Sequence, residues 1–334
     1  MKRNVIVSLG GLALAFALST PAGATATSGE LYFTTFAGGA NVHKVSFSYN
    51  GVSSFTLGTP ATVASTPGAD GIVFAPNGDL LVGGQGNSVN MVNPTTGAFT
   101  TVNAGGINSY HIMLDPNGKQ AWTSGIPGTP ATIPLVPSFA NGTAHPLTFA
   151  TGAPAYIDTI AWDSHGDAFY TSSGAAGFGT FGKIDLTTFV VTPEITGLPA
   201  AHGMTFDPFT GDLILYGDDH ISQINPSTPT VLVSDFTNPF GVTFDQGTVD
   251  GKGNIYAATN NGYLVFMDYS GSGLVGSPTN FVSSPFLAGA LDDVAPLVGA
   301  GSNPHPSVPE PGTLLLLGSG IAGLAGFKRY LSNR

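Results

Sequence analysis

Cysteine is absent from the 334-residue sequence, so a catalytic thiolate, a cysteine-ligated zinc site and a disulfide bond are all excluded. Charge is also scarce, because only 9% of the residues are Asp, Glu, Lys or Arg, where about 25% is average. Five of the nine basic residues lie near the two ends, which leaves residues 27–307 with four bases and 19 acids. This acidic interior repels phosphate and excludes nucleic acid as a partner.

The chain instead contains 47 glycines, 25 prolines and 42% hydrophobic residues. That hydrophobic content excludes a disordered chain, and the glycines follow no collagen-like period of three. Apolar residues alternate over short stretches bounded by turn residues, and the 3.6-residue period of an amphipathic helix is missing from the body. The sequence therefore predicts an all-β fold.

The N-terminus has the three-part order of a secretory signal peptide. A basic pair precedes an apolar run from Val5 to Leu18, and small residues at 22–26 then offer cleavage sites. The alternative is a retained membrane anchor, which the short length of the run disfavours, because a spanning helix needs about 20 apolar residues. We expect residues 1–26 to be a signal peptide and the mature chain to be exported.

The C-terminus contains a second signal. Residues 300–307 form a linker rich in Pro, Ser and Gly, which leads to the triplet Pro309-Glu310-Pro311. An apolar segment follows the triplet, with a basic cluster directly behind it. The trailing bases are expected to hold the tail on the cytoplasmic side and to leave the domain outside.

This order closely resembles the PEP-CTERM sorting signal of exported proteins in Gram-negative bacteria that make extracellular polysaccharide. The resemblance covers residues 308–334 and implies a transmembrane helix over 313–331 in the inner membrane. It also implies recognition of Pro309, Glu310 and Pro311 by an exosortase, and a final location at the cell surface or outside the cell. A plain C-terminal anchor is the alternative.

Between the two signals one pattern occurs five times. Each copy is an apolar strand, a turn of the Asp-Pro-Asn-Gly type and a second strand. The copies begin at Gly71, His111, Thr159, Gly203 and Gly241. Their spacings of 40, 48, 44 and 38 residues match the length of a four-stranded propeller blade.

A sixth copy starts at Leu291 but does not complete a blade. Residues 31–36, 42–49 and 54–57 supply three strands with no first strand before them. We therefore expect the two ends of the mature chain to share one blade, which removes the exposed sheet edge and closes the ring. The prediction is a six-bladed β-propeller over residues 27–299, with seven blades as the alternative.

The repeat resembles the bacterial propellers of the NHL, gluconolactonase-like and streptogramin-lyase-like type. The resemblance implies a fold but no particular activity, because one fold carries many functions. The Asp-Pro-Asn-Gly turns and the loop at 245–254 also allow a calcium-loop interpretation. The sequence favours a structural role for them, since Asx and Gly residues are what a tight strand connection needs.

In a propeller the first strand of each blade lines the central channel, so the residue before each copy lies at the channel mouth. The residues at or next to these positions are Asp70, Tyr110, His111, Asp158, His202, Phe240, Asp292 and Asp293. Clustered carboxylates raise one another's pKa or bind a cation. Oxygen ligands suit Ca²⁺ or Mg²⁺, and added histidine also admits Zn²⁺ or Mn²⁺.

We therefore hypothesise a divalent cation such as Ca²⁺ at the mouth. The predicted metal ligands are Asp70, Asp158, His202 and Asp292. The predicted ligand-binding residues are Tyr110 and His111. The alternative is that each Asp accepts hydrogen bonds from the N–H groups of its own loop.

Few residues support an enzyme. The lactonases and lyases among the similar propellers use Glu as a ligand or base, whereas this propeller has only Glu30 and Glu194, both expected away from the mouth. No Gly-x-Ser-x-Gly or His-Glu-x-x-His motif occurs, and Asp218-Asp219-His220 fits a turn of the fourth blade. The sequence favours a non-enzymatic binding or matrix component linked to extracellular polysaccharide. The alternative is a metal-dependent hydrolase or lyase at the channel mouth.

Overall fold

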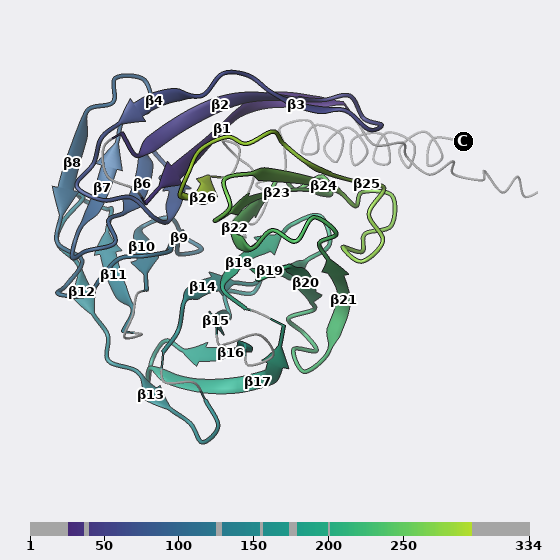
Figure 1. Ribbon diagram of the computed structural model, residues 1–334. Helices are drawn as coiled ribbons and strands as arrows, with labels where there is room; N and C mark the ends of the chain where they lie inside the picture. The colour runs from purple at the N-terminus through teal and green to yellow at the C-terminus, as the bar shows by residue number, and fades with distance from the viewer. Residues whose placement is uncertain are drawn as a thin grey trace, which may run out of the picture.

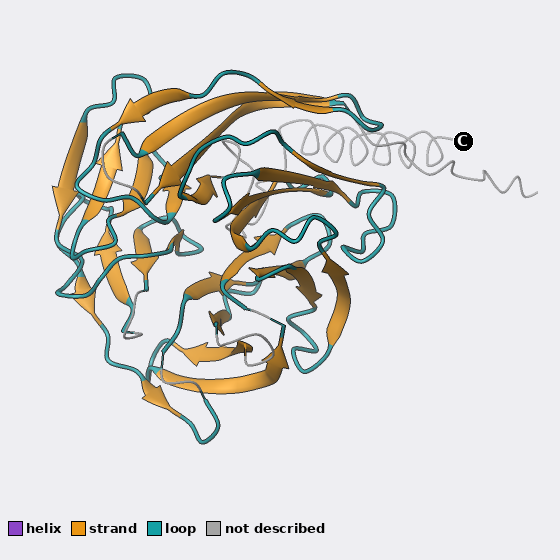
Figure 2. Cartoon of the chain, viewed as in Figure 1, coloured by secondary structure: helices purple, strands orange, loops and turns teal. Residues whose placement is uncertain are grey.

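Six sheets arranged in a ring form the body of the protein, as the computed structural model shows (Figure 1). The structure describes residues 26–36, 40–124, 129–153, 156–173, 179–199 and 201–295. Within these ranges the chain consists of strands and loops (Figure 2), and none of it forms a helix able to cross a membrane. The predicted all-β, six-bladed propeller is confirmed.

Five blades are each built from consecutive strands. Blade 1 contains β5 (Ile72–Phe74), β6 (Leu80–Gly83), β7 (Val89–Val92) and β8 (Phe99–Val102). Blade 2 contains β9 (Ile112–Leu114), β10 (Gln120–Thr123), β11 (Ala131–Pro134) and β12 (Thr143–Ala144). Blade 3 contains β14 (Thr159–Trp162), β15 (Ala168–Ser172), β16 (Gly179–Asp185) and β17 (Val190–Leu198), with β13 (Thr148–Phe149) parallel to β17 at its edge.

Blade 4 contains β18 (Gly203–Asp207), β19 (Asp212–Gly217), β20 (His220–Ile224) and β21 (Leu232–Thr237). Blade 5 contains β22 (Phe244–Val249), β23 (Asn254–Thr259), β24 (Leu264–Asp268) and β25 (Asn280–Ser283). The first strands of successive blades contact one another around the centre of the ring (Figure 1). Each blade therefore presents the start of its first strand to the central channel.

The sixth blade joins the two ends of the propeller. Its strands run in the order β26 (Leu291–Ala295), β1 (Thr27–Thr35), β2 (Val42–Tyr49) and β3 (Phe55–Leu57), and β4 (Ala61–Ala64) also pairs with β2. Strands β26 and β1 lie side by side although they are far apart in the sequence (Figure 1). Closure by both ends is therefore confirmed.

Apolar side chains fill the space between neighbouring blades. Trp122 of blade 2 meets Trp162 of blade 3 edge to face, with ring centroids 6.0 Å apart. Phe47 of blade 6 lies 5.0 Å from Tyr256 of blade 5 by the same measure. Since hydrophobic burial around the ring holds the blades together, polar residues are free to gather at its centre.

Two β-bulges lie where acidic residues reach the channel. Between β22 and β23, Phe244 pairs with Thr259 and Gly247 with Ala257, so β22 contains one extra residue. Between β26 and β1, the pairing shifts in the same way across Asp292 and Asp293, with the extra residue in β26. A bulge interrupts the strict alternation of side chains and redirects one of them. It therefore accounts for two consecutive buried acids in β26.

The prediction for the fifth copy was wrong by five residues. Its first strand is β22, so the residue at the mouth is Asp245, and Phe240 lies on the preceding loop with 51% of its surface exposed. The error arose because Thr243-Phe244-Asp245 imitates the strand end at Thr205-Phe206-Asp207. A better guide is the constant separation of five residues between the mouth residue and the turn Asp, as from His202 to Asp207 and from Asp245 to Asp250.

Several predictions concern residues outside the described ranges. They are residues 1–25 of the signal peptide, the linker at 300–307, the sorting motif at 309–311 and the transmembrane helix at 313–331.

Candidate metal centre

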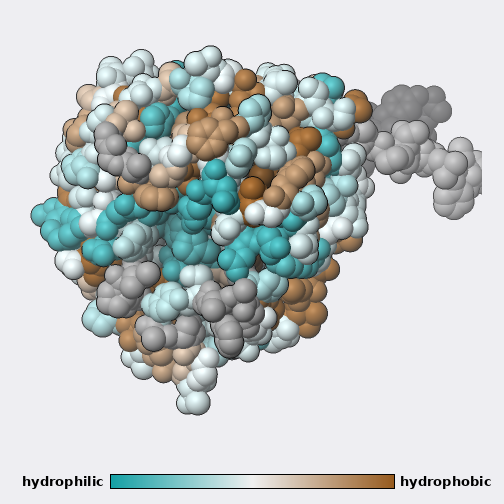
Figure 3. Space-filling model, in the orientation of Figure 1, coloured by the Kyte–Doolittle hydropathy of each residue, from teal (hydrophilic) through white to brown (hydrophobic). Residues whose placement is uncertain are grey.

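The six first strands place polar side chains around one cavity at the channel mouth. The cavity has a volume of about 210 Å³ and is lined by Asp70, Tyr110, His111, Asp158, His202, Asp245 and Asp292. In the space-filling view, hydrophilic residues gather across the middle of the ring (Figure 3). All of the lining residues except Asp245 belong to the set predicted from the sequence, and Phe240 of that set lies outside the cavity. Their roles as ligands stay predictions.

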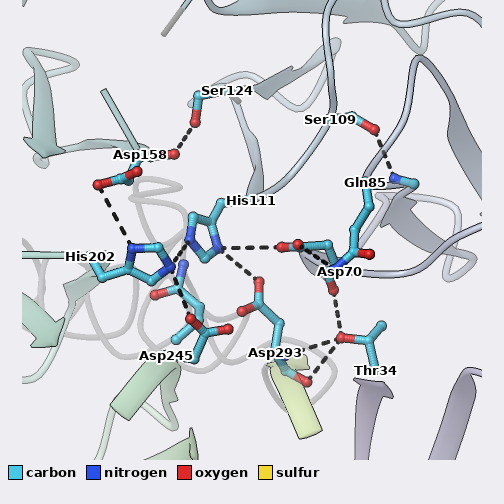
Figure 4. A network of polar contacts seen from close by, with 12 residues as sticks. Thr34, Asp70, Gln85, Ser109, His111, Ser124, Asp158, His202, Asp245 and Asp293 are labelled. Atoms are coloured by element: carbon cyan, nitrogen blue, oxygen red, sulfur yellow. Dashed lines mark hydrogen bonds and ion pairs between the residues drawn. The ribbon is translucent and has the colours of Figure 1, made fainter. Parts of the chain in front are cut away.

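Two histidines meet at the centre of the site (Figure 4). The Nε2 atoms of His111 and His202 are 3.1 Å apart, and their rings cross at 77°. Nε2 of His202 also lies 2.9 Å from Oδ1 of Asp245. One ligand atom from each of the three residues lies within 4.8 Å of the others, so these side chains can share one ion.

The opposite nitrogen of each ring faces a carboxylate. Nδ1 of His111 lies 3.1 Å from Oδ2 of Asp293 and 4.0 Å from Oδ1 of Asp70. Nδ1 of His202 lies 3.7 Å from Oδ2 of Asp158. A carboxylate in this position orients a metal-binding imidazole and makes its second nitrogen a better ligand.

This orientation leaves three acceptor atoms facing one another. When Nδ1–H of each histidine points at a carboxylate, Nε2 carries a lone pair and no hydrogen. The two Nε2 atoms then converge with Oδ1 of Asp245, which is also an acceptor. The arrangement needs a positive charge between these atoms, either a proton or a metal ion.

In the absence of metal, protons supply that charge. Burial acts to lower the pKa of His111, but the carboxylates of Asp293 and Asp70 together outweigh burial and the pKa rises to about 9. Burial likewise acts to lower the pKa of His202, and the carboxylates of Asp245 and Asp158 together outweigh it, so that this pKa lies well above its usual value. Burial acts to raise the pKa of Asp245, but the His202 imidazolium lowers it below its usual value.

Asp70, Asp292 and Asp293 hold their protons more tightly than usual. Burial raises the pKa of Asp70 to about 7. It also raises the pKa values of Asp292 and Asp293, and neighbouring carboxylates add to the effect. Several buried carboxylates thus compete for a small number of positive charges at the mouth.

The spacing of the ligand atoms fits a transition-metal ion. With metal–ligand bonds of about 2.1 Å, adjacent ligands of an octahedral ion lie about 3.0 Å apart, and those of a tetrahedral ion about 3.4 Å apart. The observed separations of 3.1 and 2.9 Å match adjacent octahedral positions. Two histidines and one carboxylate on one side of an ion leave further positions open. The side chain of His202 is 33% exposed, so an ion can reach it from the channel.

Asp70 and Asp158 lie on the Nδ1 side of the two histidine rings. Asp158 accepts a hydrogen bond from the backbone N–H of Ser173 and faces His202. Asp70 accepts a hydrogen bond of 3.2 Å from Nε2 of Gln85 and faces His111. Asp70 also belongs to a group with His111 and Asp293 whose ligand atoms lie within 4.8 Å of one another. Both acids are placed to position the histidine rings, and their role as metal ligands stays a prediction.

Close backbone contact between blades keeps the site compact. A Cβ atom added to Gly203 would lie 2.7 Å from the carbonyl oxygen of Asp245. Only glycine lets β18 and β22 approach this closely, and that approach sets the distance between His202 and Asp245.

The acids at the turns have a different environment. Asp207 accepts hydrogen bonds from the backbone N–H groups of Phe209 and Thr210 and from the hydroxyl of Tyr269. Asp250 accepts backbone hydrogen bonds from its own turn as well. These contacts agree with the structural role that the sequence favoured over a calcium loop.

The cluster at 218–220 forms the predicted turn of blade 4, between β19 and β20. Nδ1 of His220 lies 2.8 Å from Oδ2 of Asp235 on β21, so this histidine is paired outside the mouth. The backbone carbonyl of Asp218 accepts a hydrogen bond from the N–H of Phe244. The turn therefore supports β22 through its backbone.

Residues 307–329 match the PEP-CTERM protein-sorting motif. The chain is thus an exported protein with a C-terminal sorting signal for processing by an exosortase, as the sequence predicted. No curated protein matches the chain.

Solved propellers are similar in fold. Virginiamycin B lyase from Staphylococcus aureus is 11% identical with a TM-score of 0.51, over 80% of this chain and 90% of that chain. A putative 6-phosphogluconolactonase from Bacteroides uniformis is 15% identical with a TM-score of 0.50, over 75% and 82%. The Cps50 (Swd1) β-propeller domain of Myceliophteria thermophila is 14% identical with a TM-score of 0.50, over 76% and 87%. At these identities the comparisons establish the fold alone, and the predicted resemblance to lactonase-type and lyase-type propellers is confirmed at that level.

Proposed function

We propose that this exported propeller binds one divalent transition-metal ion through His111, His202 and Asp245 and serves as a metal-dependent binding component of the cell surface. The observation that carries the proposal is the convergence of two Nε2 atoms and a carboxylate oxygen within reach of one ion. Imidazole and carboxylate ligands favour a first-row ion such as Mn²⁺ or Zn²⁺.

The partner that we propose is extracellular polysaccharide, which rests on the sorting signal. A cavity of about 210 Å³ has room for one small group beside the ion, and a polymer does not fit inside it. The polymer would therefore be held by a terminal or protruding oxygen group that completes the shell of the ion. Oxygen groups of sugars suit the open positions.

A metal-dependent hydrolase or lyase is the second candidate. The observation that favours it is the three-ligand set, because catalytic metal sites keep a position open for water or substrate. In this case the ion would activate water, and the carboxylates behind the histidines would hold the rings in place.

Metal analysis of the full-length protein tests the proposed site. We expect one transition-metal ion per chain after loading with Mn²⁺ or Zn²⁺, and its loss with chelator. His202→Ala and Asp245→Asn should each abolish binding, whereas His220→Ala should keep it, because His220 pairs with an Asp outside the mouth. Failure of the wild-type protein to bind either ion would refute the proposal.

Co-sedimentation with polysaccharide separates the two candidates. Binding that depends on metal and disappears in His202→Ala supports the binding component. Turnover of ester, lactone or glycan substrates by the metal-loaded protein, lost in the same variant, supports the enzyme.

Sorting has its own test. Replacing Pro309, Glu310 and Pro311 by Ala should leave export intact and strand the unprocessed protein in the inner membrane. Fractionation and immunoblotting measure both effects, and a variant processed like the wild type would contradict the role of the triplet.

A further inference from the structure

Three acids from two neighbouring strands form a second group beside the histidines. Asp245 comes from the bulge of β22, and Asp292 and Asp293 come from the bulge of β26. Their side chains are buried, with exposures of 3%, 5% and 1%. One carboxylate oxygen from each lies within 4.8 Å of the others.

Each of these carboxylates has one oxygen that lacks a hydrogen-bond partner. The atoms are Oδ2 of Asp245, Oδ2 of Asp292 and Oδ1 of Asp293. The other oxygen of Asp245 faces His202, and the other oxygen of Asp293 faces His111. A buried polar atom without a partner is costly and calls for an unseen partner such as an ion.

The excess of negative charge at the mouth also indicates an unseen cation. Five carboxylates gather there, at positions 70, 158, 245, 292 and 293, against two imidazoles. Among the described residues, no Lys or Arg side chain pairs with any of them. One divalent ion at the histidines leaves a net charge of about −3 in a buried place, which is expensive without further cations or protons.

We propose that Asp245, Asp292 and Asp293 bind a second, harder cation, Ca²⁺, next to the transition-metal ion. This inference rests on the proposed function in one respect, namely that Asp245 bridges the two ions. Oxygen-only ligands suit Ca²⁺, and two oxygens about 2.3–2.6 Å from one ion lie at most about 5 Å apart, as these do. Water from the cavity completes the shell. Bridged ions of this kind lie about 3.5–4 Å apart.

The second ion would tie blade 5 to the closing blade. Asp245 belongs to β22, and Asp292 and Asp293 belong to β26, which pairs with β1 to complete the ring. Calcium thus links the final strand of the propeller to its neighbour without a disulfide. An exported protein meets calcium outside the cell, where calcium modules bind with Kd values of about 10⁻⁴–10⁻³ M.

Equilibrium dialysis of the full-length protein against radioactive calcium, with Mn²⁺ or Zn²⁺ loaded first, tests the inference. We expect one calcium ion per chain in addition to the transition-metal ion, with Mg²⁺ as the competing hard cation. Asp292→Asn should weaken calcium binding about 10–100-fold and keep the transition metal. Asp293→Asn should weaken calcium binding as well, and it should also weaken the transition metal, because the carboxylate of Asp293 orients His111. Asp235→Asn is the matched control and should change neither ion.

The outcomes separate the two proposals. Transition-metal binding without calcium overturns the second site and leaves the proposed function standing, whereas binding of neither ion overturns both. Calcium binding that survives in both Asp292→Asn and Asp293→Asn places calcium elsewhere and also overturns the inference. With Mn²⁺ in both positions, an exchange-coupled electron paramagnetic resonance spectrum supports adjacent ions, and two independent Mn²⁺ signals contradict them.

Discussion

The innermost strands carry acidic residues at both ends, and these acids have hydrogen-bond donors at the turn end but partly lack them at the channel mouth. At the turn end, Asp207 is fully buried and each of its oxygens accepts hydrogen bonds. At the mouth end, Asp245, Asp292 and Asp293 are equally buried, and each has an oxygen without a partner. The difference shows that burial of a carboxylate does not by itself indicate function. Acids that lack partners and also converge on one another indicate a site, whereas an acid that accepts hydrogen bonds from its own turn holds that turn.

The largest effect is expected from a substitution that removes the hydrogen bonds of an acid at the turn end. In Asp207→Asn an amide nitrogen would face the N–H of Thr210 and the hydroxyl of Tyr269, both of which are donors. We expect the free energy of unfolding to fall by about 3–4 kcal/mol, with or without metal. Urea unfolding followed by fluorescence measures the change. A loss that metal repairs would mean that Asp207 belongs to the metal site.

The mouth end should respond to pH when metal is removed. The pKa of His111 is about 9 when folded and about 6.5 when unfolded, so the folded protein holds this proton longer. Its stabilising contribution is complete below pH 6.5 and is lost as the pH rises through about 9, on the order of 3 kcal/mol. Asp70, with a pKa raised by burial to about 7, adds a fall of the same sign between about pH 4 and 7.

Metal should reverse that trend, because metal ligands must be deprotonated to bind. Denaturation curves at pH 6 to 9, with chelator and with Mn²⁺, make the comparison, and His111→Gln provides the control without the slope. A profile with chelator that stays level from pH 6.5 to 9 would contradict the proposed proton at His111.

The same Asp-to-Asn change at the mouth should increase the free energy of unfolding, whereas Asp207→Asn at the turn decreases it. Asp292→Asn is expected to raise the stability of the metal-free protein by about 1–2 kcal/mol. On folding, Asp292 must either take up a proton or bury a negative charge, and both cost free energy, whereas the neutral amide of Asn avoids this cost. The same variant should gain less stability from added metal than the wild type. Urea unfolding with chelator and with Ca²⁺ measures both. If Asp292→Asn destabilises the metal-free protein as much as Asp207→Asn does, the acids at the mouth are stabilising hydrogen-bond acceptors like those at the turns, and the proposed difference between the two ends is wrong.

The smallest effect tests the corrected position of the fifth copy. Phe240 is exposed and lies outside the cavity, although it stacks on Phe281 at 5.5 Å. We expect Phe240→Ser to change the free energy of unfolding by less than about 0.5 kcal/mol and to leave metal affinity unchanged. Metal titration of this variant beside Asp245→Asn is the measurement. Loss of metal binding in Phe240→Ser would restore the original alignment.

Most of the fold could be predicted because it rests on local patterns. The turn chemistry at Asp207 and Asp250 repeats at blade length, and the unpaired strands at both ends require a shared blade. The fifth copy was misaligned because short β-strands have weak local signals, and Thr243-Phe244-Asp245 at the start of β22 looks like a strand end. The spacing of five residues from the mouth to the turn would have located Asp245.

The candidate site was predictable as a set of positions and not as a geometry. Which residues share the mouth follows from the repeat, because each blade contributes the start of its first strand. Which nitrogen of His111 faces which acid does not follow, since the partner is Asp293, 182 residues away. Nor does the repeat predict the bulges that turn Asp245 and Asp292 toward the channel, because a bulge depends on pairing with a neighbouring strand.

The sequence by itself thus determined the C-terminal sorting signal, the repeat and the closure of the ring, and it favoured six blades over seven, because each is a contiguous pattern of a few residues or its recurrence at a fixed spacing. Only the tertiary structure decided which acids find donors in their own turns and which converge on the histidines without them. The reason is physical. Local hydrogen bonds are settled within a few residues, whereas the charge balance of a buried site depends on every strand that the ring brings to its centre.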